Sequence, residues 1–214
     1  MNFLALSLLI SVQISAAGAP RIAIRAFKAE RQMEIWGAAN DHGPFHLLKT
    51  YPIAAISGDL GPKRKDGDMQ APEGFYCINR FNPKSQFHLS LGLNYPNSSD
   101  RKLGDPNHLG KDIFIHGNRV SAGCLAMTDP VIDVIYGMAI RARGAGQKAI
   151  PVSIFPCRMT AQNWESLRKQ YAQRPDLIGF WETLIPAYNS FEHTHIWPRP
   201  HVGRDGSYIW PGLQ

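Results

Sequence analysis

Long apolar segments are almost absent from this sequence of 214 residues. The one near its start, Phe3 to Val12, is too short to span a bilayer as a stable anchor, and no later run reaches the length of a transmembrane helix. Small residues, Ser15 to Ala19, follow it in the pattern that signal peptidases cut, although the only positive charge before Phe3 is the terminal amine. We therefore predict a signal peptide at 1–19 and a protein secreted across the inner membrane, periplasmic or associated with the cell wall. A buried first strand or an uncleaved anchor is the alternative.

Charged side chains are also few, at 19% of the chain, and none occurs in the first nineteen residues. The net charge of +6 therefore belongs to the mature protein. No block of lysine and arginine interleaved with aromatic residues is present, which argues against nucleic acid as a partner. A positive charge suits an acidic or polymeric partner, but it also serves simply to keep an exported protein soluble.

Cysteine occurs only three times, at Cys77, Cys124 and Cys157. Because an oxidising compartment pairs exposed thiols, the odd number leaves at least one of them free. A disulfide between Cys77 and Cys157 would close a loop of about 80 residues and add roughly 4 kcal/mol in the chain-entropy description. The alternative is that both are small, buried core residues, since the sequence does not fix the distance between two strands.

Alternating apolar residues predict a first half rich in β-strand. We expect strands at 21–28, 33–37, 45–53, 75–78, 86–93 and 112–116, and irregular segments at 58–74 and 94–110. The capping signal Thr128-Asp129-Pro130 predicts a helix that Gly144 and Gly146 end. A strand follows at 149–155, and then helical stretches from 160 and at 175–191, the second interrupted by Pro186.

The length suffices for one well-packed domain and is marginal for two. We therefore predict a mixed α/β, β-rich fold with a main domain at 20–157 and a helical C-terminal extension at 158–214 packed on it. No internal repeat, low-complexity segment or linker interrupts this organisation.

The densest chemical signal is a histidine and a cysteine eight residues apart, each beside a glycine: His116-Gly117 and Gly123-Cys124. A thiol is a weak nucleophile until it loses its proton, so a cysteine enzyme needs a nearby imidazole. His116 ends a predicted strand and Cys124 precedes a predicted helix, so a loop that folds back could bring them within hydrogen-bond distance. Gly123 permits close approach of a substrate and could turn its own amide and that of Cys124 towards a developing oxyanion.

Spacing alone leaves other interpretations open. A buried thiol beside a histidine at the end of a strand is a common structural feature. A zinc site would need two further ligands, and the other histidines show no metal-ligand spacing except His193 and His195 in the tail, where a surface or packing role is the simpler explanation. We predict neither a metal nor a cofactor.

The motif and its surroundings resemble a known family. His-Gly followed by Ser-x-Gly-Cys is similar to the YkuD-type L,D-transpeptidase catalytic domain, in particular its YafK-like branch, in which the spacer between histidine and cysteine is short. The similarity spans roughly 21–156 and continues at 180–195, and its landmarks are Gly61-Pro62-Lys63, Gly67-Asp68, Pro72 to Tyr76, Asn82 to Ser85 and Tyr95-Pro96-Asn97. The resemblance implies a β-sandwich or barrel with one helix after the catalytic cysteine and a helical C-terminal appendage.

The resemblance also implies a role for each residue of the motif. Cys124 corresponds to the nucleophile and His116 to its base. Gly117 and Gly123 correspond to the glycines that shape the pocket. Ser121 corresponds to the hydroxyl residue of the motif, although a turn residue that caps the loop explains it equally well.

Substrate binding is less clearly marked. Arg119, with its neighbour Asn118, is either a clamp for a substrate carboxylate or part of a solvated loop. The wider family usually has a second histidine where this chain has Ala122, and an arginine where it has Ala126. The resemblance therefore assigns no carboxylate-binding arginine at position 126.

The implied reaction is acyl transfer on the stem peptides of peptidoglycan, through a thioester on Cys124. An amine acceptor makes the enzyme a transpeptidase, whereas water makes it an amidase, which could detach a lipoprotein from peptidoglycan. Both reactions use the same residues. Two alternatives come from other classes: a non-catalytic wall-binding module, against which the intact His116 and Cys124 pair argues, and a secreted cysteine protease, against which the order of histidine before cysteine argues.

Overall fold

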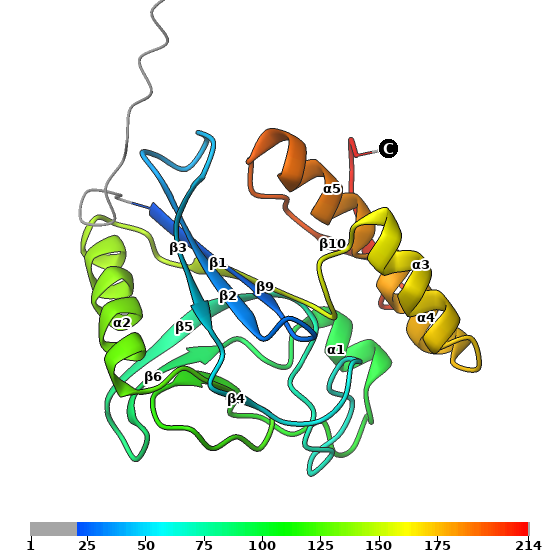
Figure 1. Cartoon of the computed structure of the whole chain (residues 1–214), viewed down its shortest axis with the longest axis horizontal. Coiled ribbons are helices and arrows are strands. Elements are labelled where there is room, and N and C mark those ends of the chain that lie inside the picture. The colour runs from blue at the N-terminus through cyan, green and yellow to red at the C-terminus, as the bar shows by residue number, and fades with distance from the viewer. Residues whose placement is uncertain (1–20, 214) are drawn as a thin grey trace, which may run out of the picture.

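A computed structural model describes residues 21–213, so the predicted signal peptide at 1–19 lies outside the described part of the chain. The structure confirms the predicted mixed α/β class, with one curled sheet and helices on both of its faces (Figure 1). The strands of this sheet are β1 (Arg21–Phe27), β2 (Gln32–Ala38), β3 (His46–Pro52), β4 (Ala55–Ile56), β5 (Gly74–Ser85), β6 (His88–Leu93), β7 (Phe114–His116), β8 (Leu125–Ala126) and β9 (Ile150–Phe155). The helices are α1 (Ser98–Leu103), α2 (Asp129–Gly144), α3 (Ala161–Gln170), α4 (Pro175–Glu182) and α5 (Ile185–Thr194), and a separate hairpin consists of β10 (His201–Val202) and β11 (Tyr208–Ile209). Within 21–213, no helix combines the length and the apolar character needed to cross a membrane.

The sheet joins segments that are far apart in the sequence. Its strands follow the order β3-β2-β1-β9-β5-β6-β7-β8-β4, and neighbours are antiparallel except for two pairs, β1 with β9 and β7 with β8. The chain returns from α2 through β9, which inserts between β1 and β5 and places Val152 beside Ile24. The centre of the sheet therefore exists only once both ends of the main domain have come together.

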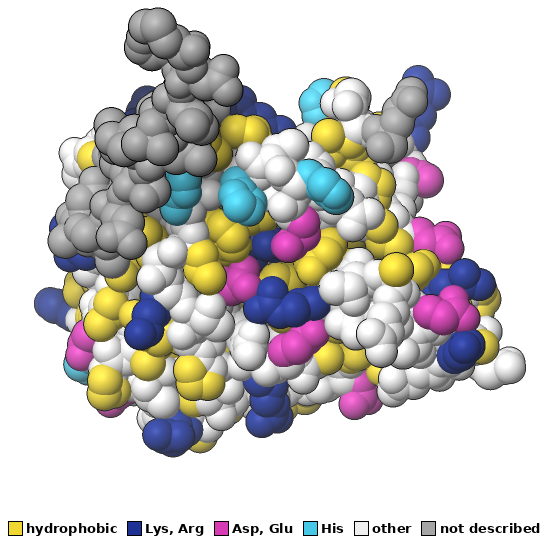
Figure 2. Space-filling model, turned by 45° about the horizontal axis from the view of Figure 1, so that its top comes forward, with side chains coloured by type: hydrophobic (Ala, Val, Ile, Leu, Met, Phe, Trp, Pro, Cys, Tyr) yellow, Lys and Arg dark blue, Asp and Glu magenta, His cyan; other side chains and the backbone are white. Residues whose placement is uncertain are grey.

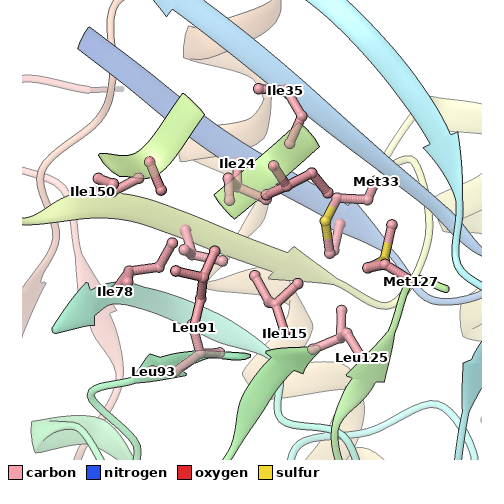
Figure 3. Close-up of a cluster of buried hydrophobic side chains, with 14 of the residues drawn as sticks. Ile24, Met33, Ile35, Ile78, Leu91, Leu93, Ile115, Leu125, Met127 and Ile150 are labelled. Carbon is pink, nitrogen blue, oxygen red and sulfur yellow. The ribbon is translucent and has the colours of Figure 1, made fainter. Parts of the chain in front are cut away.

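β1 shows how the sheet is covered on both faces. Its residues from Ile22 to Phe27 are all buried, whereas a strand with one face in water would alternate. Ile22, Ile24 and Ala26 join the main hydrophobic cluster, which α2 covers (Figure 3). Phe27 joins a second cluster with side chains of α4 and α5, and Figure 1 shows these helices on the side away from α2.

Charge is spread over the surface. On the face drawn in Figure 2, basic and acidic side chains are interspersed with apolar ones, and the basic side chains do not merge into one patch. This face therefore offers no extended basic stripe of the kind that binds a nucleic-acid backbone.

Most predicted elements lie where the sequence pattern put them, and the differences have local causes. α1 forms within the segment predicted as irregular, because Asn97 and Asp100 form a capping box around a helix too short to show an apolar stripe. Pro186 lies in the first turn of α5, so it marks the start of a helix instead of breaking one. Thr128 precedes α2 as predicted, but its side chain makes no capping hydrogen bond. The tail contains the β10–β11 hairpin, which the sequence pattern does not indicate.

The structure decides between the two predictions for Cys77 and Cys157. All three cysteines are free. Cys77 lies opposite Pro151 in the β5–β9 pair, and β9 runs on for four residues to Phe155, about 13 Å, before the chain reaches Cys157. A disulfide needs Cα atoms within about 7 Å of each other. Cys157 is buried and Cys77 is half-buried, so both are packing residues.

A buried ion pair ties the sheet to the C-terminal helices. Glu73 is fully buried, and its carboxylate accepts from Lys28 Nζ at 3.0 Å, Gly61 N at 2.7 Å and Trp181 Nε1 at 2.6 Å. Lys28 Nζ also donates to the carbonyls of Gly61 and Ala71, at 2.8 and 2.9 Å. Because both charges have several hydrogen-bond partners, the pair meets the condition under which a buried ion pair is tolerated. It fixes the end of β1, the 58–73 loop and α4 relative to one another.

Replacing Glu73 by alanine should lower the free energy of unfolding by about 3–5 kcal/mol, because Lys28 would be left buried and unpaired. Chemical denaturation measures this change. The control is Asp176→Ala, which breaks an ion pair with Arg174 whose side chains are 62% and 56% exposed, and should cost less than about 1 kcal/mol. Equal losses in the two variants would contradict the role given to Glu73.

Candidate active site

The pairing of β7 with β8 brings His116 and Cys124 to the same face of the sheet. Ile115 lies opposite Leu125 in this parallel pair, and both point into the main cluster (Figure 3). The residues next to them in sequence therefore point to the other face. Cys124 immediately precedes β8, and its Sγ accepts a hydrogen bond from Phe114 N at 3.4 Å. The two positions are thus separated by one strand spacing, about 4.8 Å, and by two residues along the strand, about 6.6 Å.

Two contacts hold the imidazole of His116. Its Nδ1 lies 2.6 Å from Gly117 O, and since a carbonyl only accepts, Nδ1 carries the proton and Nε2 keeps the lone pair of a base. The ring of Phe87 packs against it, with ring centroids 4.7 Å apart. Burial lowers the pKa of His116 below its usual 6.5, and the hydrogen bond to Gly117 O offsets this only in part. The imidazole is therefore neutral at pH 7 and ready to accept a proton.

The thiol of Cys124 rests in its protonated form. Burial raises the pKa of Cys124, while the Phe114 N–H and the positive charge of Lys63 work in the opposite direction. Sγ also lies 3.8 Å from Asp112 O, to which it donates weakly. In the described part of the chain, these are its hydrogen-bond partners, so a neutral thiol faces the same surface as a neutral imidazole without a bond between them. Proton transfer requires the two side chains to approach, as catalytic pairs do when a substrate closes the site.

Glycine is required at both ends of the loop between His116 and Cys124. A Cβ on Gly117 would lie 2.5 Å from Asp129 Oδ1 and 2.7 Å from Phe87 O. Gly123 has φ +101°, in the region that side chains disfavour, and its Cβ would lie 3.0 Å from Gln70 O. The two glycines predicted to shape the pocket are therefore required by the backbone, since a side chain at Gly117 would clash and one at Gly123 would be strained.

The amides predicted to form an oxyanion site are already engaged. Gly123 N donates to Ser57 Oγ at 2.6 Å, and Cys124 N donates to Ser121 Oγ at 3.1 Å. Ser121 Oγ in turn donates to Cys124 O at 2.7 Å, which is the arrangement of a residue that closes a turn. Ser121 thus braces the loop that presents the thiol, and an oxyanion role for Gly123 stays a prediction.

Asn118 and Arg119 lie on the exposed part of the same loop. Asn118 has φ +63°, its backbone N donates to Asp129 Oδ1 at 2.7 Å, and its side chain accepts from Arg119 N at 2.5 Å. Asn118 is thereby a turn residue that links the loop to the start of α2. The structure brings neither side chain to the thiol, and substrate binding by this pair stays a prediction.

Two further residues at the site were not predicted from the sequence. Ser57 follows β4 and holds Gly123 through the hydrogen bond described above. Lys63 is buried, and its Nζ donates to Asp68 Oδ1 at 2.6 Å and to Lys65 O at 2.8 Å, which fixes its charge near the thiol. The only sequence signal for Lys63 was its place in the Gly61-Pro62-Lys63 landmark, and Ser57 carried none. Among residues 21–213, no three His, Cys, Asp or Glu side chains are grouped so as to hold a metal ion.

Comparison with known proteins gives consistent results. Residues 21–154 match the family of the L,D-transpeptidase catalytic domain, YkuD. YafK from Escherichia coli strain K12, a candidate L,D-transpeptidase, is 38% identical over 194 residues, which cover 90% of this chain and 74% of YafK. The YafK protein of Escherichia coli O157:H7 gives the same values.

A solved structure shares the fold. Two crystal structures of the helical cell shape determining protein Pgp2 from Campylobacter jejuni match 64% of this chain with TM-scores of 0.51 and 0.50 and 21% identity. This chain spans about half the length of Pgp2, 47% and 48% in the two structures. At this identity the likeness concerns the fold alone.

The protonation states of the pair predict how Cys124 reacts with iodoacetamide. Because burial disfavours the thiolate, the alkylation rate should rise with pH through a midpoint above that of an ordinary cysteine. In His116→Ala the base that accepts the thiol proton is lost, so alkylation near pH 7 should slow about tenfold. Peptide mass mapping separates Cys124 from Cys77 and Cys157.

A second histidine provides the control for this experiment. His88, on the neighbouring β6, is 43% exposed and pairs with Asp133, so His88→Ala should leave the alkylation of Cys124 unchanged. If wild type and His116→Ala are alkylated at one rate at every pH, His116 is not the base.

Proposed function

Since this chain belongs to the L,D-transpeptidase catalytic domain family, YkuD, we propose that it transfers acyl groups on peptidoglycan stem peptides through a thioester on Cys124. The observation that supports this most directly is the β7–β8 register, which gives His116 and Cys124 one face of the sheet. The hydrogen bond from Nδ1 to Gly117 O adds to this support, because it leaves Nε2 as the acceptor for the thiol proton.

In the first step, Cys124 Sγ attacks an amide carbonyl of the stem peptide, at its diaminopimelate residue. The thiol proton passes to His116 Nε2, a C–S bond forms, and the carbonyl oxygen becomes a tetrahedral oxyanion. Protonated His116 then gives this proton to the leaving amine as the C–N bond breaks. The products are a thioester on Cys124 and a free amine, with His116 neutral again.

In the second step, an amine of another stem peptide attacks the thioester carbonyl. His116 removes a proton from the attacking nitrogen, the new C–N bond forms, and Cys124 leaves and recovers its proton from His116. Water in place of the amine gives a carboxylic acid by the same proton transfers. This is the amidase alternative, in which the amine released in the first step belongs to a wall-linked lipoprotein or to a stem peptide. The resting neutral pair serves both outcomes, and the acceptor decides between them.

The proposed substrate requires export to the compartment that contains peptidoglycan. We infer a periplasmic or cell-wall location, with the segment 1–19 as the cleaved signal and 158–214 as an extension packed on the catalytic domain. Determination of the N-terminal residue of the mature protein tests this inference.

Replacing Cys124 by alanine should abolish turnover of purified muropeptides while the far-UV circular dichroism and thermal unfolding stay as in wild type. Mass spectrometry of the wild-type protein after brief incubation should show a covalent adduct on Cys124, and the product masses should show whether an amine or water resolves it. Cys77→Ala, which removes a half-buried thiol away from His116, is the matched control and should turn over normally. Turnover by the Cys124→Ala variant at the wild-type rate would end the cysteine-enzyme proposal.

The decrease of kcat/KM at low pH, its acid limb, should reflect protonation of His116. A base must be neutral to act, and the pKa of His116 is lowered below 6.5 chiefly by burial, so the acid limb of kcat/KM, where the imidazole gains its proton, should be centred below pH 6.5. Phe87→Ala removes the ring that packs on the imidazole and should move the limb up towards pH 6.5. An acid limb centred above pH 6.5 in the wild type, or one that moves down in Phe87→Ala, would contradict this assignment.

A further inference from the structure

A cavity lies beside the loop that presents Cys124, between the main sheet and the C-terminal extension. It encloses about 440 Å³ and is bounded by the 60–70 loop, α1, α4 and the β10–β11 hairpin. Apolar side chains, among them Leu60, Leu177 and Phe180, form much of its wall, and Arg64 and Gln70 line it as well. A volume of this size holds a short peptide segment.

Arg64 is held in place and yet unused as a donor. Its guanidinium lies over the ring of Phe180, 4.8 Å from the ring centroid, and its Nη1 is 3.8 Å from Asp100 Oδ1, beyond hydrogen-bond distance. Within 21–213, the N–H groups of this guanidinium have no hydrogen-bond acceptor, and Nη1 is buried without one. The side chain remains 28% exposed, and because Nη1 is buried, Nε and Nη2 form the edge that a ligand can reach. A planar fork that is fixed by stacking and has open donors suits a carboxylate.

Gln70 links this cavity to the thiol. Its side-chain Oε1 is buried without a hydrogen-bond donor, while its carbonyl lies 3.0 Å from the position that a Cβ on Gly123 would occupy. The residue therefore has one side in the cavity and the other against the loop that presents Cys124.

The other charged groups of the cavity are already paired. Arg174 binds Asp176 at 2.7 Å, and Asp205 accepts from Ser207 Oγ at 2.7 Å. Asp100, beside Arg64, has both carboxylate oxygens within hydrogen-bond distance of the single hydroxyl of Tyr76, at 3.1 and 3.0 Å, and it accepts from Asn97 N at 3.0 Å. Arg64 thus supplies the open cationic donors of the cavity among residues 21–213.

We propose that this cavity binds a peptide segment with a free carboxylate, which Arg64 holds through its Nε and Nη2 donors. The inference rests on the proposed function, since a stem peptide has free carboxylates, and it makes the cavity a subsite that positions the peptide for Cys124. The C-terminal extension then contributes to specificity through Phe180 and the wall of α4.

Calorimetric titration of the Cys124→Ala protein with a synthetic stem tetrapeptide tests this subsite without turnover. A set of peptides in which one carboxylate at a time is converted into an amide identifies the group that Arg64 binds. We expect Arg64→Met to weaken binding of the unmodified peptide at least about tenfold, because it removes a charge-assisted hydrogen bond. In the Cys124→Ala protein, one amidated peptide should bind weaker than the unmodified peptide by the same factor. When Arg64→Met is added to that protein, this amidated peptide and the unmodified peptide should bind equally.

Two further variants control the test. Arg64→Lys retains the charge beside Asp100 but lacks the planar guanidinium, so it should also weaken binding, and it replaces Arg64→Met if that variant folds poorly. Arg174→Met should stay within about twofold, because Arg174 is 56% exposed and paired with Asp176. Unchanged affinity in Arg64→Met and Arg64→Lys, or equal losses for every amidated peptide in both proteins, would overturn the subsite. The result is separable from the proposed function, since binding is measured without turnover and the Cys124→Ala assay addresses turnover alone.

Discussion

The buried pair of Lys28 and Glu73 is the constraint on which the arrangement of the site depends. Lys28 follows β1, Glu73 precedes β5, and the hydrogen bonds from this pair reach the 58–73 loop and Trp181 of α4. Ion pairs of this kind tolerate little displacement, because each unmet hydrogen bond in the interior is costly. The loop fixed in this way, with Ser57 directly before it, supplies Lys63 to the thiol on one side and Arg64 and Gln70 to the cavity on the other.

The electrostatics at Cys124 favour a thiol that is protonated at rest. Burial raises the thiol pKa and lowers the imidazole pKa, so both groups rest uncharged. An uncharged pair avoids the cost of a buried thiolate in the free enzyme, and a resting thiol is less readily oxidised in an oxidising compartment. Lys63 and the Phe114 N–H then favour the thiolate as it forms. The proposed catalytic pair is thus uncharged at rest and is not a preformed ion pair.

The C-terminal extension does more than cover the sheet. Its aromatic side chains complete the second hydrophobic cluster, and α4 and the β10–β11 hairpin form walls of the cavity that contains Arg64. Figure 1 shows the extension against the side of the sheet opposite α2. Because Trp181 binds Glu73 while Phe180, its neighbour, stacks on Arg64, stability and the proposed peptide subsite are built from adjacent residues of one helix.

The sequence by itself determined the strands of the first half, α2, the helical C-terminal part and the residue types His116 and Cys124, because alternation, capping signals and short motifs are local properties of the chain. It left open whether Cys77 and Cys157 pair, and only the β5–β9 register separates them. It also gave no sign of Ser57 beside Gly123, or of Gln70 at the same loop, since both lie more than 50 positions earlier in the sequence. Such contacts arise when strands distant in sequence are paired in register and a buried ion pair fixes the loop between them, and no local pattern encodes that pairing.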